Sequence, residues 1–157
     1  MRIVESLLTN ELTRPKRALT TVKGIVFHWN GIGGMRVSRV RDEYERNDRR
    51  DHLESAHYIV DLDGGIYQCI PDNEIAYHVG SKQRDPESGK IYTDYARTKF
   101  GSYAERPELS SPNECTIGIV MCTTDNDGNF TEETLRSHGV SKNYSFKKVL
   151  QRHIRNI

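Results

Sequence analysis

The sequence KGIVFHWN, residues 23–30, contains a short apolar run that ends in a histidine, His28. Residues 24–27 are rich in β-branched and aromatic side chains and are bounded by polar ones, which predicts a short buried strand. Asparagine and glycine dominate positions 30–34, so the chain is expected to turn directly after this strand. A histidine where a rigid strand opens into a loop is a candidate for chemistry. The alternative is a core histidine that is hydrogen-bonded to the backbone.

The chain of 157 residues has the size of a single domain, which buries about two-thirds of its unfolded surface. With 35% hydrophobic and 29% charged residues, it is expected to be soluble and globular. No apolar run approaches the roughly 20 residues of a membrane span. Residues 1–17 have too short an apolar core for a secretory signal. We therefore predict one domain over residues 1–157, synthesised in the cytoplasm without a signal peptide.

The cysteines and the charges narrow the class of protein further. Cys69, Cys115 and Cys122 cannot all pair with one another and lack the spacing of a zinc finger, which indicates a reduced compartment. Net charge is −5 over residues 1–135 but +6 over residues 136–157, which contain no acidic residue. The body of the chain shows no basic stripe with interleaved aromatic residues, so no nucleic-acid partner is expected.

Strand and helix patterns alternate along the chain, which predicts an α/β fold with a mixed central sheet of about four or five strands flanked by helices. The predicted strands are residues 24–27, 55–61, 65–70 and 115–123. The second and third are expected to form a hairpin around the turn at 61–64. The fourth is almost wholly apolar, which is typical of a central strand.

The remaining segments divide into predicted helices and predicted loops. The predicted helices are residues 36–53, residues 131–137 and a last helix that begins at Ser145. The first of them presents Val37, Val40 and Tyr44 on one face, and Thr131 is a good N-cap for the second. Residues 1–22 and 81–114 are expected to be irregular, and a connection as long as the latter usually shapes a binding site.

Three segments in order resemble the zinc-dependent N-acetylmuramoyl-L-alanine amidases of type 2, which are related to phage-lysozyme-type amidases and peptidoglycan recognition proteins. They are IVFHWN (25–30), SAHYIVDLDGGIYQCIPDNEIAYHVG (55–80) and NECTIGIVMC (113–122). The resemblance covers about residues 20–133 and leaves residues 134–157 as a divergent basic tail. It implies a fold like that of the peptidoglycan recognition proteins and a monomer that hydrolyses the amide between N-acetylmuramic acid and L-alanine. Such a peptidoglycan hydrolase would serve as a phage endolysin or Gram-positive autolysin, acting on the cell wall after release.

The resemblance also implies a zinc cofactor. A zinc hydrolase needs about three protein ligands and one open position, so that the metal acidifies a bound water and polarises the scissile carbonyl. The resemblance makes His28 the first ligand. The other family ligands are a histidine near the C-terminus and a following cysteine or aspartate, with a lysine that stabilises the oxyanion. Here His138 is the candidate, but no cysteine or aspartate follows it, so weak zinc binding is expected.

The fourth predicted strand departs from the family as well. Many relatives read TIGIE there, with the glutamate as general base, whereas this chain has Val120, so its catalytic residue is unknown. His57 and His78 are the candidate substrate-binding residues, although His57 could instead face the sheet core. We expect His78 to share a groove with His28. Val120 and the tail favour an alternative function, a catalytically impaired or truncated amidase-like module that binds peptidoglycan.

Overall fold

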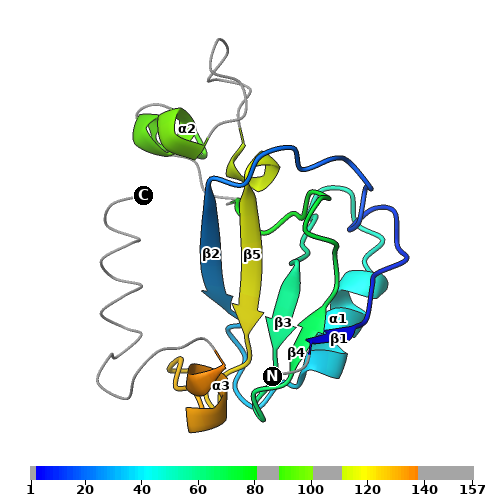
Figure 1. Cartoon of the computed structure of the whole chain (residues 1–157), viewed down its shortest axis with the longest axis vertical. Coiled ribbons are helices and arrows are strands. Elements are labelled where there is room, and N and C mark those ends of the chain that lie inside the picture. The colour runs from blue at the N-terminus through cyan, green and yellow to red at the C-terminus, as the bar shows by residue number, and fades with distance from the viewer. Residues whose placement is uncertain (1–2, 81–88, 101–110, 138–157) are drawn as a thin grey trace.

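The structure, a computed structural model, describes residues 3–80, 89–100 and 111–137. Its described part is built on a five-stranded sheet in the order β1-β4-β3-β5-β2 (Figure 1). The strands are β1 (Ile3–Glu5), β2 (Gly24–Trp29), β3 (Tyr58–Val60), β4 (Ile66–Gln68) and β5 (Thr116–Met121). The helices are α1 (Val37–Glu45), α2 (Asp94–Phe100) and α3 (Glu132–Arg136), with a 3-10 helix, η2, at Pro112–Glu114. The predicted α/β class is confirmed.

The sheet is mixed, as expected. β3 and β4 pair antiparallel, whereas the β1–β4, β3–β5 and β2–β5 pairs are parallel. A hydrogen bond of 3.0 Å, from the backbone amide of Gly64 to the carbonyl oxygen of Asp61, closes the turn between β3 and β4. Gly64 has φ +78°, a conformation that glycine adopts without steric cost. β5 lies between β2 and β3, so the predictions of a hairpin and of a central apolar strand are both correct.

The prediction that residues 1–22 and 81–114 are irregular was wrong at three places, which are β1, α2 and the short η2. Residues 3–5 form β1, which pairs in parallel with β4 although all three side chains are exposed. This edge strand pairs through its backbone, and its apolar residues Ile3 and Val4 are adjacent and do not alternate with polar ones, so no period of two marks it. Within 81–114, residues 94–100 form α2, a short helix with only Ala96 buried.

The first predicted helix is shorter than expected. α1 ends at Glu45, not at residue 53, and buries Val37, Val40 and Tyr44 as predicted. Beyond it the side chain of Asn47 donates to the carbonyl of His52 at 2.7 Å, an alternative to helical bonding that asparagine often offers. The helix after Thr131 is confirmed as α3.

Two apolar clusters lie on opposite faces of the sheet. One joins α1 to the sheet and includes Val40, Tyr44 and Val120. The other includes Val60 and Met121, with Phe27, Phe130 and Leu135 packed against it. Because side chains alternate along a strand, His28 lies on the α1 side of β2, opposite to Phe27.

Of the divergent tail, residues 134–137 are described and lie in α3 or at its end. The predicted helix from Ser145 and the candidate ligand His138 both lie outside the described residues. Among the residues that are described, no helix is both long enough and apolar enough to cross a membrane.

Candidate functional site

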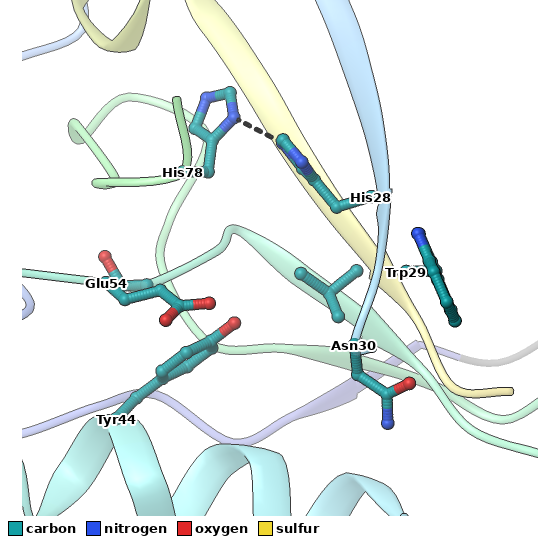
Figure 2. A pocket seen from close by; sticks show the side chains of 8 residues that line it. His28, Trp29, Asn30, Tyr44, Glu54 and His78 are labelled. Carbon is teal, nitrogen blue, oxygen red and sulfur yellow. Dashed lines mark hydrogen bonds between the residues drawn. The ribbon is translucent and has the colours of Figure 1, made fainter. Parts of the chain in front are cut away.

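A small pocket opens on the α1 side of the sheet, where β2 and β5 end (Figure 2). It brings together residues from β2, α1, the segment before β3, the segment after β4 and β5. The lining residues are His28, Trp29, Asn30, Tyr44, Glu54, Ser55, His78 and Val120. The pocket therefore contains both predicted groove histidines, His28 and His78, together with the valine of the TIGIV sequence.

His28 is positioned by the pairing of β2 with β5. It is in register with Val120, and Val26 is in register with Gly118. Alternation places all four residues on one face. His28 lies in β2, one residue before its end, which agrees with the prediction of a histidine at the end of the first strand. Burial lowers the pKa of its imidazole, so the ring is neutral at neutral pH.

His78 lies across β5 at the place where that strand has no side chain. A Cβ added to Gly118 would come within 2.3 Å of Cγ of His78, so only glycine leaves room for this ring. Asn113 holds the backbone at His78. Its Oδ1 accepts hydrogen bonds from the backbone amides of His78 at 3.0 Å and Val79 at 2.7 Å. The imidazole is thus fixed from two directions.

The hydrogen bonds of His78 identify its tautomer. Nε2 lies 3.2 Å from the carbonyl oxygen of Thr116 and 3.1 Å from its hydroxyl. The carbonyl can only accept, and the hydroxyl donates its own proton to the carbonyl of Pro112 at 2.7 Å. Nε2 of His78 must therefore be the donor. Its Nδ1 carries a lone pair, which faces Nε2 of His28 at 3.1 Å (Figure 2).

His57 lies beside His78 but is closed off. Its side chain is fully buried, Nδ1 accepts from the amide of Gly118 at 3.0 Å, and Nε2 donates to the carbonyl of Glu74 at 2.9 Å. Burial is the main reason why its pKa is lowered. Both ring nitrogens are used by the backbone, so this geometry matches the structural alternative for His57. No contact supports its prediction as a substrate-binding residue.

The wall opposite the histidines was missed by sequence reasoning. Tyr44 is buried, and its pKa is raised well above the usual value by burial and then by the carboxylate of Glu54. Figure 2 shows the Glu54 carboxylate directed toward the Tyr44 hydroxyl at the rim of the pocket. Helical spacing had assigned Tyr44 to the core, and nothing in the pattern around Glu54 marked it. Only the fold brings these two side chains to the pocket.

The described residues match a zinc site in donor type but not in number. His28 and His78 offer two imidazoles, the commonest nitrogen ligands of zinc. Across residues 3–80, 89–100 and 111–137, no group of three or more His, Cys, Asp or Glu is placed to hold a metal ion. The three cysteines are free and buried, and burial raises the pKa of Cys122 to about 12, which disfavours the thiolate. No chemical step can be derived through a metal from these residues.

Comparison with known proteins agrees with the resemblance. A family model described as N-acetylmuramoyl-L-alanine amidase (Amidase_2) matches residues 18–140. The chain is 30% identical over 129 residues to a probable N-acetylmuramoyl-L-alanine amidase of Bacillus licheniformis, covering 82% of this chain and 31% of the relative. It is also 30% identical over 126 residues to the amidase BlyA of Bacillus subtilis (strain 168), covering 80% and 30%. The chain thus spans about a third of the length of these relatives.

Solved structures show the same fold at lower sequence identity. A mutant endolysin from Bacillus subtilis aligns with a TM-score of 0.56 at 21% identity, covering 98% of this chain and 77% of the other. PlyL aligns with a TM-score of 0.56 at 17% identity, covering 88% and 68%. The Staphylococcus aureus hydrolase AmiA aligns with a TM-score of 0.51 at 15% identity, covering 88% and 51%. The observed sheet is therefore the scaffold of known endolysins and amidases.

Proposed function

Because the family model covers most of its length, the chain belongs to the N-acetylmuramoyl-L-alanine amidase family Amidase_2, and we propose that it hydrolyses peptidoglycan. The bond cleaved is the amide between N-acetylmuramic acid and L-alanine. The observation that carries this proposal is the meeting of His28 and His78 in one pocket at the end of β2. The chain acts as a monomer on the cell wall after its release from the cytoplasm in which it is made.

Zinc is the proposed cofactor, with His28 as one ligand. When bound, zinc would supply an acidified water and polarise the scissile carbonyl. The family ligand set remains incomplete on the described residues, and the role of His138 as a second ligand stays a prediction.

The Tyr44 side of the pocket supplies a hydroxyl group and a carboxylate. The raised pKa of Tyr44 keeps its hydroxyl protonated, so it can donate a hydrogen bond to a carbonyl oxygen in the pocket. Glu54 is the one carboxylate among the described residues that line the pocket. It can accept a proton from a water that attacks the amide, which is the task that the apolar side chain of Val120 cannot perform.

The second candidate function is peptidoglycan binding without hydrolysis. It is favoured by Val120, which is 6% exposed and lies in the apolar cluster next to α1, where relatives that read TIGIE have a carboxylate. A buried valine neither accepts a proton nor orients water. In that case the pocket would retain the cell-wall peptide but not cleave it.

One experiment separates these functions. The purified protein is incubated with insoluble peptidoglycan, and the soluble fraction is analysed by mass spectrometry for peptides with a free N-terminal L-alanine. Co-sedimentation measures binding in the same samples. Release of such peptides is the expected result. Binding without release would support the second function, and absence of both would refute the two together. His28→Ala, which removes a pocket imidazole, is the matched variant that should abolish release.

A further inference from the structure

We propose that His78 is a metal ligand and that, with His28, it forms a two-imidazole site for a divalent transition-metal ion such as Zn²⁺. This inference rests on the proposed function and deepens it, because it names a second protein ligand for the ion among the residues that the structure describes. It concerns two ligands of the ion and leaves its further positions open. His78 had been predicted to bind substrate, so the two roles make different predictions.

The distance between the two rings is the first argument. Nε2 of His28 and Nδ1 of His78 are 3.1 Å apart. Two nitrogens bound at about 2.0–2.1 Å to one tetrahedral ion are separated by roughly 3.3–3.4 Å. To share an ion, the nitrogens must part by a few tenths of an ångström, and the rings must also turn, because the nitrogens that now face each other must both point to the ion. The planes are inclined by 72°, so the rings are not stacked face to face.

The second argument is the set of hydrogen bonds behind His78. Metal-binding histidines almost always donate their other ring N–H to a carbonyl, a carboxylate or water, which fixes the tautomer and the orientation of the ring. His78 has this arrangement, because Nε2 donates to Thr116 and leaves Nδ1 with its lone pair toward His28. Asn113 and the missing side chain at Gly118 hold the ring in this place.

Binding of an ion also requires a change of tautomer at His28. In the metal-free protein the N–H of His28 Nε2 donates to His78, and ion binding requires that this proton move to Nδ1 of the same ring.

His57, the histidine next to His78, is not available as a metal ligand. It contacts His78 edge to face, with ring centroids 5.9 Å apart. Both of its nitrogens are already paired with backbone groups. An ion would have to break one of these buried hydrogen bonds and leave a backbone group without its partner. The assignment therefore falls on His28 and His78.

The test is a calorimetric titration of the metal-free protein with Zn²⁺ alone. The wild-type protein is compared with His28→Ala, His78→Ala and the control His52→Ala, which removes an exposed histidine outside the pocket. We expect one bound ion per chain, at least a tenfold loss of affinity in each pocket variant, and no change in the control. Wild-type affinity in His78→Ala, or no binding to the wild-type protein, would overturn the proposal.

A second measurement uses the wild-type protein only and so does not depend on whether a variant folds. Imidazole ¹⁵N resonances are recorded while Zn²⁺ is added. Coordination should shift Nδ1 of one histidine, assigned as His78, and Nε2 of another, assigned as His28. A His78 Nδ1 resonance unmoved by saturating Zn²⁺ would overturn the proposal. Neither measurement uses amidase activity, so a zinc site without peptide release would refute the proposed function and leave the ligand pair standing.

Discussion

Two neighbouring regions of the sheet use the same side chain in opposite ways. Around His57, in the interior, both imidazole nitrogens are bonded to backbone groups of Gly118 and Glu74. Around His78, at the pocket, one nitrogen is bonded to Thr116 and the other faces His28. The rings are only 5.9 Å apart. The identity and burial of a histidine therefore say less about its role than the direction of its two nitrogens does.

The largest effect on stability is expected where the interior histidine is removed. His57→Ala creates a cavity and leaves the amide of Gly118 and the carbonyl of Glu74 buried without partners. We expect a loss of about 4 kcal/mol in the free energy of unfolding, measured by urea denaturation. His78→Ala should lose less, because its side chain is partly exposed. An equal or larger loss in His78→Ala would remove the distinction between the two regions.

The sequence predicted the scaffold better than the site. An almost unbroken apolar run predicted β5, which is buried on both faces, and apolar periodicity predicted the buried face of α1, which packs on one side only. It also placed His28 correctly on a strand that leads to an open end. β1 was not predicted, because a short, exposed edge strand pairs through its backbone and shows no burial pattern.

The roles of the histidines after β2 could not be read from local pattern. In SAHY, alternation allowed His57 either face of the sheet, and only the backbone partners decide between them. Glu54 and Tyr44 meet at the pocket because the chain between α1 and β3 returns there. Such a meeting depends on tertiary structure, and no period or motif encodes it.

A second prediction uses Gly118, the residue that touches both regions. In Gly118→Ala the new methyl group would lie 2.3 Å from Cγ of His78, which forces the ring outward or the strands apart. Overpacking of this kind costs about 2 kcal/mol. Thermal or urea unfolding measures that cost, and the ¹⁵N spectrum should show a displaced His78 with His57 unchanged. A variant as stable as the wild type, with the original His78 resonances, would show that β5 does not restrict the ring.

A third prediction concerns pH. The pKa of His78 is lowered to about 3, mainly by burial, so the folded protein binds fewer protons than the unfolded chain between pH 6.5 and about 3. Lowering the pH in this window therefore favours the unfolded state. The contribution of neutral His78 to the free energy of unfolding is fully present above pH 6.5 and is lost progressively as the pH falls below it. Between pH 6.5 and 4.5, protonation of His78 in the unfolded chain should lower the free energy of unfolding of the metal-free wild-type protein by about 2 kcal/mol. Metal-free His78→Gln should lack this decrease.

The smallest effect on stability is expected at the rim of the pocket. Glu54→Gln changes one exposed carboxylate, whose side chain is 57% exposed, into an isosteric amide. The free energy of unfolding should change by less than about 0.5 kcal/mol. If Glu54 accepts a proton from the attacking water, peptide release should nevertheless fall by roughly 10²-fold or more, because an amide cannot act as a base. Mass spectrometry of the released peptides measures this loss.

Glu43→Gln is the matched control, since it makes the same change on an exposed carboxylate of α1, which pairs with Arg39 at 3.5 Å outside the pocket. Both variants should sediment with peptidoglycan like the wild type, because neither alters the fold. Loss of release in Glu54→Gln alone would separate a rim residue that acts in the reaction from an interior residue, His57, that acts only on stability. Equal release by the two variants would show that Glu54 does not compensate for Val120. Glu54 at the rim would then take no part in the reaction, like His57 in the interior.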